Sequence, residues 1–164
     1  MTDLGRAALN STGLREHAHR YLDELRARTS YAIGLGVLEG TEVLYVDRLR
    51  SYRRGRGRVG PDLQAGSRVP AYCTAMGKLL LANLPEVQQL ALLASMKLTK
   101  HAPKTLTSKR ALRQQLEEIR VTGFAVSDQE LAADVLAVAV PVRDRACEVV
   151  AAVNLVADTS VISL

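Results

Sequence analysis

The residues best suited to chemistry lie between Val69 and Leu84, in the stretch VPAYCTAMGKLLLANL. A thiolate at Cys73 would be a nucleophile if a base lay beside it. The small residues Cys73-Thr74-Ala75 stand where a helix begins, and a helix N-terminus attracts anions through its unpaired N–H groups and its dipole. The same residues also fit an ordinary threonine-capped helix. On their own they leave all three interpretations open.

The rest of the sequence offers little to a nucleophilic cysteine or to a metal ion. His17 and His19 are two positions apart on a predicted helix, so their side chains point in nearly opposite directions. Cys73 and Cys147 form no C-x-x-C pair, and no H-x-x-x-H spacing occurs. A cysteine at the start of a helix is more commonly a small buried residue than a nucleophile. We therefore expect no catalysis, no metal and no cofactor, and keep a small Cys73-dependent enzyme as an alternative.

The composition limits the class of protein. Apolar residues make up 48% and charged residues 24% of the 164 residues, which is normal for one soluble globular domain. No apolar stretch approaches the ~18 residues that cross a bilayer, and the N-terminus has no hydrophobic signal region. Two cysteines make no disulfide framework. We expect a cytoplasmic protein without a membrane partner. Its net charge of +5 permits an organic-acid or nucleic-acid partner without requiring either.

An arginine-rich run, RLRSYRRGRGR, carries six arginines between Arg48 and Arg58. Such a run can grip phosphate, but Tyr52 is the one aromatic residue within it and no helix-turn-helix pattern accompanies it. We interpret the run as the end of a hairpin followed by an exposed loop, which could also steer a carboxylate ligand.

The apolar pattern predicts the elements that must position these residues. A helical period marks residues 13–28, a stretch from about 71, 85–96 and 108–121, with Gly123 as the last helix's stop. Strand-like runs cover residues 31–38, 42–49, 124–131, 135–142 and 148–156. The first two form a hairpin. The fourth lacks alternation and is predicted to be a central strand covered on both faces. This order predicts an α/β (α+β) domain with a mainly antiparallel sheet flanked by helices.

Three polar residues near the predicted strands are candidates for the rim of a pocket. Asp128 and Glu130 precede the fourth strand, where acids are usually solvated turn residues. Asn154 falls among apolar neighbours in AAVNLVA. A buried amide needs hydrogen-bond partners, and either the backbone or a ligand can supply them.

Three segments, in the correct order, resemble IclR-type bacterial transcriptional regulators. LGRAALNSTGLREHAHRYLDELRART resembles their linker and first helix, and GSRVPAYCTAMGKLLLANLP the most recognisable stretch of their effector-binding domain. GFAVSDQELAADVLAVAVPVRDRACEVVAAVNL resembles the second signature of that domain. The resemblance implies a GAF-like, profilin-like fold. Residues 1–12 are then the remnant of a linker from a missing DNA-binding domain, and residues 13–164 an effector-binding domain with a truncated C-terminal helix.

The resemblance also implies a pocket for a small organic acid, between the turn before the MGK helix and the facing end of the sheet. Within the family, this stretch is most like the regulators of the protocatechuate and β-ketoadipate pathway for aromatic acids. Carried over by motif, the pocket lining falls on Tyr72, Cys73, Thr74, Ala75, Met76, Glu130, Ala137, Pro141, Asn154 and Val156.

The sequence departs from the family pattern inside the second signature. Relatives tend to have Gly-Leu-Arg-Ser before this strand, where residues 134–137 are Asp, Val, Leu and Ala, and a serine common in the last strand is Val156. The absent arginine and serine are polar groups that could hold a carboxylate, and Arg68 is a candidate substitute. Leu136, Ala137 and Val156 also keep open a ligand-free dimerisation domain with a collapsed pocket.

The family resemblance implies a sensor of a small organic acid. Such a domain self-associates as a dimer or tetramer and meets DNA only through a winged helix-turn-helix domain upstream. A ligand would act by binding one arrangement of the domains better than another, which shifts the equilibrium between them.

Overall fold

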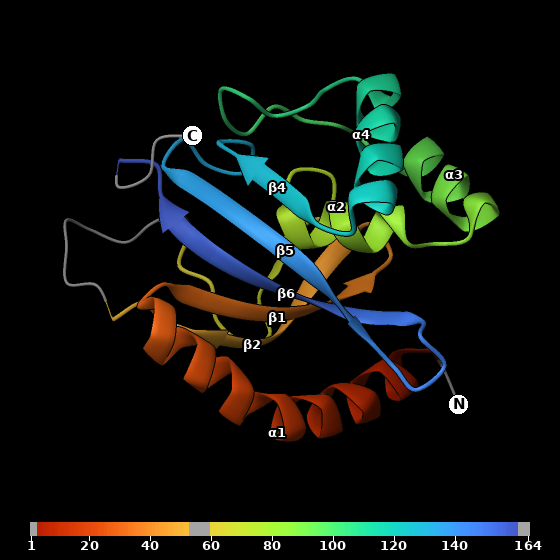
Figure 1. The fold of residues 1–164 in the computed structure, drawn as a ribbon. Helices are drawn as coiled ribbons and strands as arrows, with labels where there is room; N and C mark the ends of the chain where they lie inside the picture. Colours follow the sequence, from red (N-terminus) through yellow and green to blue (C-terminus); the bar gives the residue numbers. More distant parts are fainter. Residues whose placement is uncertain (1–2, 53–59, 161–164) are drawn as a thin grey trace.

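The protein folds into a curled, six-stranded antiparallel sheet with helices on both faces (Figure 1). The computed structural model describes residues 3–52 and 60–160, with side chains from residue 13 onward. The helices are α1 (Asp3–Thr29), α2 (Ala75–Ala82), α3 (Glu86–Ser95) and α4 (Lys109–Thr122). The strands are β1 (Ala32–Glu39), β2 (Glu42–Leu49), β3 (Arg68–Pro70), β4 (Ala125–Asp128), β5 (Val135–Arg143) and β6 (Val149–Asp158). The predicted α+β class is confirmed.

The sheet pairs the first strand of the chain with the last one. Its strand order is β3-β2-β1-β6-β5-β4, so β1 and β6 lie side by side in the middle. Gly34 of β1 is paired with Asn154 of β6, and Asn154 is paired on its other side with Ala139 of β5. Asn154 therefore stands at the centre of the sheet, which explains why it is buried.

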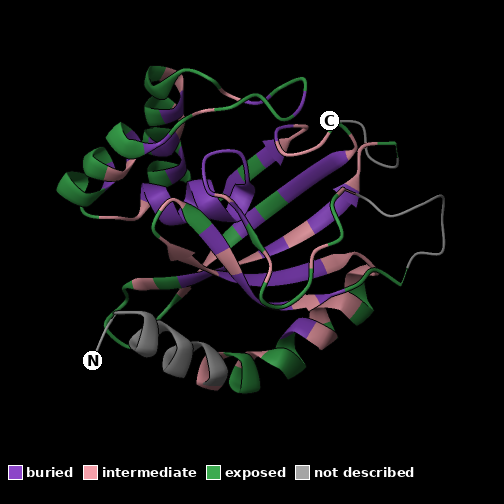
Figure 2. Ribbon diagram, turned by 180° about the vertical axis from the view of Figure 1, so that it is seen from behind, coloured by how far each residue is buried: buried purple, intermediate pink, exposed green. Residues whose placement is uncertain are grey.

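The helices cover the two faces of the sheet differently. α1 packs on β1 and β2 on one face, over a cluster that includes Leu22, Ile33 and Leu35. α2 packs on the other face against β1, β2, β4, β5 and β6, and α4 packs against α2. All eight residues of α2 are buried, and Figure 2 shows this helix as part of the main core. The residues around the start of α2 are therefore held against the sheet from several sides.

Several elements differ from the sequence prediction. α1 begins at Asp3, so helix continues through most of the segment predicted to be a linker. The sequence does not predict the short strand β3. β2 spans the predicted strand, residues 42–49, and so includes Arg48 at the start of the arginine-rich run; residues 53–59 of that run lie outside the described residues.

The prediction that residues 135–142 are covered on both faces is wrong. Val138 and Val140 of β5 are exposed, and α1 packs mainly on β1 and β2 on that face of the sheet. Figure 2 shows exposed positions alternating with buried ones along β5.

Candidate ligand pocket

Thr74 sets the turn before α2. Its backbone is extended (φ −126°, ψ 147°), and its side-chain oxygen accepts a hydrogen bond of 3.2 Å from the N–H of Gly77. Gly77 lies so close to the preceding chain that a Cβ there would stand 2.2 Å from the carbonyl oxygen of Ala71. Only glycine, which has no Cβ, lets the turn fold back this tightly on the helix.

The capped turn leaves two backbone donors free. The first N–H groups of a helix lack intrahelical partners. Here the Thr74 N–H bonds to the carbonyl of Ala71 at 3.4 Å, and the Lys78 N–H to the carbonyl of Thr74 at 2.9 Å. Among the described residues, the N–H groups of Ala75 and Met76 have no acceptor. This end of α2 can therefore receive a hydrogen-bond acceptor from a ligand.

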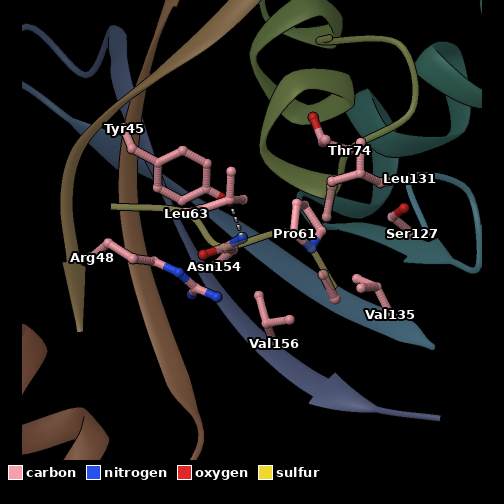
Figure 3. A pocket seen from close by; sticks show the side chains of 12 residues that line it. Tyr45, Arg48, Pro61, Leu63, Thr74, Ser127, Leu131, Val135, Asn154 and Val156 are labelled. Atoms are coloured by element: carbon pink, nitrogen blue, oxygen red, sulfur yellow. Dashed lines mark hydrogen bonds between the residues drawn. The ribbon is translucent and has the colours of Figure 1, made fainter. Parts of the chain in front are cut away.

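A pocket lies between this turn and the sheet (Figure 3). The empty space among its lining residues is about 390 Å³, including the part open to solvent. An apolar wall with a few polar groups is typical of small-molecule sites. The apolar lining comprises Pro61, Leu63, Ala75, Leu131, Val135, Ala137 and Val156, and the polar lining Tyr45, Arg48, Thr74, Ser127 and Asn154.

A β-bulge turns two polar side chains of β2 into this pocket. The register of β2 against β1 shifts by one residue, which leaves Val46 as the extra residue. Val46 and Asp47 consequently both face α1, where Asp47 Oδ2 lies 2.6 Å from Nδ1 of His19. Tyr45 and Arg48, on either side of the bulge, both face the pocket.

Tyr45, Arg48 and Asn154 form the polar end of the pocket (Figure 3). Asn154 Nδ2 donates a hydrogen bond of 3.4 Å to the Tyr45 hydroxyl, and the guanidinium carbon of Arg48 lies 5.7 Å from the centre of the Tyr45 ring. Burial lowers the pKa of Arg48 and raises the pKa of Tyr45. Two of the four buried side-chain atoms that have no hydrogen-bond partner among the described residues lie here, Asn154 Oδ1 and Arg48 Nη1. Such atoms are uncommon in native structures, and an ordered water or a ligand atom is the kind of partner that satisfies them.

Gly34 makes room for this polar end. A Cβ at Gly34 would stand 2.5 Å from Asn154 Oδ1 and 2.7 Å from a ring carbon of Tyr45. Any side chain there would displace both groups, so the glycine allows the amide and the aromatic ring to meet over β1.

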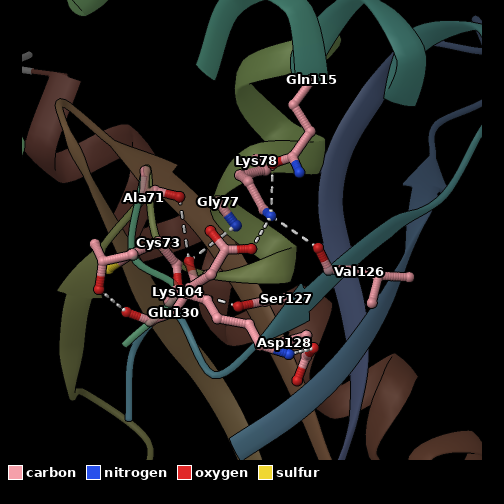
Figure 4. Close-up of polar contacts among 12 residues, drawn as sticks. Ala71, Cys73, Gly77, Lys78, Lys104, Gln115, Val126, Ser127, Asp128 and Glu130 are labelled. Carbon is pink, nitrogen blue, oxygen red and sulfur yellow. Dashed lines mark hydrogen bonds and ion pairs between the residues drawn. The ribbon is translucent and has the colours of Figure 1, made fainter. Parts of the chain in front are cut away.

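A buried ion pair fixes α2 beside the pocket (Figure 4). Lys78 is fully buried, and its Nζ lies 2.5 Å from Oε1 of Glu130. The same Nζ donates to the carbonyl of Val126 at 2.7 Å and to the side chain of Gln115 at 2.8 Å. Burial lowers the pKa of Lys78 and raises the pKa of Glu130, and the opposite charge of each partner offsets part of that effect. The pair ties the helix to β4 and to the segment after it.

The structure brings half of the predicted pocket residues to this pocket. Five of them line it, namely Thr74, Ala75, Ala137, Asn154 and Val156. The other five do not line it, namely Tyr72, Cys73, Met76, Glu130 and Pro141. A role in ligand binding stays a prediction for all of them.

The five residues that do not line the pocket make other contacts within the fold. The Tyr72 hydroxyl donates to the carbonyl of Thr99 at 2.7 Å, and Met76 is fully buried beside Gly36. Pro141 lies in β5, paired with β6. Glu130 is the partner of Lys78, and Cys73 lies in the core cluster around α2.

Cys73 is not set up as a nucleophile. Its side chain is fully buried, and its Sγ lies 3.9 Å from the carbonyl oxygen of Pro70. Burial, and then the negative charge of Glu130, raise the pKa of the Cys73 thiol to about 12. The thiolate is the reactive form, so very little of it exists at neutral pH. This argues against a Cys73-dependent enzyme.

Sequence reasoning missed several lining residues, above all Arg48. A regular strand alternates its faces, so the pattern would place Tyr45 and Asp47 on one face and Arg48 on the other. The bulge at Val46 reverses this order after Tyr45, and no signal in the sequence marks the bulge. Arg68, the candidate substitute for the absent family arginine, instead pairs with Glu39 at 2.5 Å and does not line the pocket.

Within residues 3–52 and 60–160, no group of three or more His, Cys, Asp or Glu side chains could hold a metal ion. No helix in the part of the chain that the structure describes has the length and apolarity to cross a membrane.

Comparison with known protein families assigns this domain to one of them. A family model described as the C-terminal domain of the bacterial transcriptional regulator IclR matches residues 6–163. The chain belongs to this family. The resemblance found in the sequence motifs is thereby confirmed.

Individual relatives agree with this assignment. The Pca regulon regulatory protein of Pseudomonas putida is 35% identical over 152 residues, which cover 93% of this chain and 51% of that protein. The chain thus spans about half the length of the curated relatives it matches.

Two solved structures are similar in fold as well as in sequence. One is a double mutant of the PobR inducer-binding domain from Acinetobacter with 3-hydroxybenzoic acid, at 30% identity and a TM-score of 0.81, covering 90% of this chain and 85% of that one. The other is an IclR homologue from Microbacterium hydrocarbonoxydans with 4-hydroxybenzoate, at 25% identity and a TM-score of 0.83, covering 94% and 61%.

Proposed function

We propose that this chain is the effector-sensing domain of a bacterial transcriptional regulator and binds a small aromatic acid between α2 and the sheet. The observation that carries the proposal is a pair of buried atoms at one end of a largely apolar pocket, Asn154 Oδ1 and Arg48 Nη1, that have no hydrogen-bond partner among the described residues. The two related structures described with hydroxybenzoates support the aromatic class. The buried Asn154 Oδ1 and Arg48 Nη1, which lack partners among the described residues, favour a sensor over a ligand-free dimerisation domain.

The domain regulates and does not catalyse. The relatives are named as regulators, and the one candidate nucleophile, Cys73, is a buried thiol whose pKa is raised to about 12. DNA is bound by a winged helix-turn-helix domain outside this chain. The effector changes DNA binding by preferring one arrangement of the domains. We place the regulator in the cytoplasm.

The domain also self-associates, as a dimer or a tetramer. Four valines on β4, β5 and β6 have side chains exposed between 37% and 48%, namely Val126, Val138, Val140 and Val150. An apolar group of this kind on a sheet surface is typical of a contact between copies.

A thermal-shift screen of hydroxybenzoates and dicarboxylic acids tests the proposed function. A ligand at 100 times its dissociation constant adds about 2.7 kcal/mol to the free energy of unfolding. For a chain of this size that raises the melting temperature by about 5–10 °C. A hydroxybenzoate should produce such a rise, with isothermal titration calorimetry confirming one site per chain. No rise and no heat with any acid of the screen would contradict the proposal.

A further inference from the structure

We propose that Arg48 holds the carboxylate of the effector, with Asn154 and Tyr45 beside it, and that the effector is a monocarboxylic acid. This inference rests on the proposed function and goes further, because it fixes which end of the pocket receives the charge and how many charges the pocket accepts.

Arg48 is a cation that has no counter-charge among the described residues. Its Nη1 is buried without a hydrogen-bond partner, and no carboxylate among the described residues forms an ion pair with it. Removing a charge from water is costly unless a partner of opposite charge replaces the water. The chain nevertheless directs this side chain into the pocket by means of the bulge at Val46. A bound carboxylate would supply the missing partner.

The surroundings hold the guanidinium in position. The ring of Tyr45 lies 5.7 Å from the guanidinium carbon, and Asn154 is 4% exposed and bonded to the Tyr45 hydroxyl. Figure 3 shows the guanidinium turned toward the space beside Asn154 and Val156. A planar guanidinium can donate two parallel hydrogen bonds to one carboxylate. The orphan Asn154 Oδ1 remains free to accept from a hydroxyl or water beside that carboxylate.

The opposite end of the pocket suits a neutral group better than a carboxylate. It offers the backbone N–H group of Ala75 and the hydroxyls of Thr74 and Ser127, none of which is charged. Ser127 already donates its hydroxyl proton to the carbonyl of Cys73 at 3.2 Å. Its oxygen can still accept a hydrogen bond. A ligand hydroxyl, which donates and accepts, fits this end.

The charge of the lining limits the ligand to one carboxylate. Among the described lining residues, Arg48 is the one with a charged side chain. The second carboxylate of a diacid would lie against the apolar wall formed by Leu131, Val135 and Ala137, where no cation compensates for its lost hydration. The structure therefore assigns the pocket to a hydroxylated monoacid with an apolar body.

Calorimetry with a matched pair of probes tests this assignment. 4-Hydroxybenzoate and its neutral analogue 4-hydroxybenzamide have nearly the same shape but differ in charge. Each is titrated into the unaltered chain, Arg48→Met, Arg48→Lys and the control Arg110→Met, which removes an exposed arginine of α4. Urea unfolding of every variant, followed by circular dichroism, establishes that the fold is intact.

The unaltered chain and Arg110→Met should prefer the acid to the amide. Arg48→Met should lose roughly 10- to 150-fold in affinity for the acid, the value of one hydrogen bond to a charged group, while the amide changes little. Arg48→Lys should keep part of the preference. The ratio of the affinity for the acid to the affinity for the amide separates charge recognition from a structural effect, because a structural effect would weaken the binding of both probes alike.

The outcomes separate this inference from the proposed function. If the unaltered chain binds the acid and Arg48→Met keeps the acid-to-amide ratio, the assignment of Arg48 is overturned and the proposed function stands. If the unaltered chain binds neither probe, nor any other acid of the screen, the assignment of Arg48 and the proposed function are both overturned. Binding of adipate, a dicarboxylic acid, as tightly as 4-hydroxybenzoate would overturn the limit to one carboxylate.

Discussion

Replacement of Glu130 by glutamine tests whether this residue binds a ligand or holds α2 in place. The motif resemblance assigns Glu130 to the pocket, but the structure pairs it with Lys78, whose side chain is fully buried. Glu130→Gln keeps the shape of the side chain and removes its charge. The buried ammonium of Lys78 then keeps only neutral acceptors, namely Gln115, Val126 and the new amide.

The expected loss of stability follows from the pair's burial. Removing one partner of a buried ion pair typically costs about 3–5 kcal/mol of the free energy of unfolding. Because neutral acceptors around Nζ remain, we expect about 3 kcal/mol for Glu130→Gln. A domain with a total stability of about 5–15 kcal/mol stays folded after such a loss. Lys78→Met/Glu130→Leu, which removes both charges, should recover most of it, since apolar replacements of buried pairs are often neutral.

The pH dependence of this variant gives an independent check. Burial lowers the pKa of Lys78 in the fold below its ordinary 10.5, so the folded state favours the deprotonated amine. At neutral pH the burial of the protonated amine therefore lowers the free energy of unfolding. This loss of stability is relieved as the pH rises between the lowered pKa and 10.5. Without Glu130 this pKa falls further, so the stability of Glu130→Gln should rise from neutral to mildly alkaline pH more steeply than that of the unaltered chain.

Urea unfolding followed by circular dichroism, combined with calorimetry of 4-hydroxybenzoate, measures both effects. We expect a large fall in the unfolding midpoint and a change in ligand affinity below about threefold, because Glu130 does not line the pocket. An unchanged midpoint together with a large loss of affinity would refute this reasoning and restore Glu130 as a ligand-binding residue.

Three further predictions concern the pocket entrance, the thiol and assembly. Ala75→Leu adds bulk where α2 meets the pocket and should abolish effector binding in a folded protein; unchanged calorimetric affinity would place the site elsewhere. In a Cys147→Ser background, Cys73 should react with iodoacetamide about 1,000-fold more slowly near pH 8 than an ordinary thiol, because a pKa of about 12 leaves that much less thiolate; mass spectrometry showing rapid labelling would disprove its burial. Sedimentation should show a dimer or larger species that Val138→Glu/Val140→Glu dissociates, and a monomer at high concentration would count against self-association.

Local signals predicted several elements correctly. α4 combines a cap at Ser108, which accepts from the N–H of Ala111 at 3.3 Å, with a stop at Gly123 in the left-handed region (φ 81°). The hairpin of β1 and β2 turns at Gly40, whose φ of 59° also favours glycine. These features depend on neighbours in sequence, and for that reason the sequence alone reveals them.

The candidate site was predicted only in part, because its remaining residues depend on distant contacts. The bulge at Val46 arises in the pairing of two strands, and it decides that Arg48 faces the pocket. The pairing of Lys78 with Glu130 joins residues 52 positions apart in sequence and takes Glu130 away from the lining. Thr74 and Asn154 were found because a helix cap and a buried amide can be recognised locally.

An NMR titration with 4-hydroxybenzoate would test the central claim most directly. In two-dimensional ¹H–¹⁵N spectra of the labelled chain, saturable shifts should concentrate on the backbone amides of Ala75 and Met76 at the start of α2 and on the side-chain amide of Asn154. Ala75 and Asn154 line the pocket at its two polar ends, and Met76 follows Ala75 directly in α2. Binding there is the result that the account predicts. Saturable shifts confined to other parts of the chain, or no shifts at millimolar ligand, would contradict it.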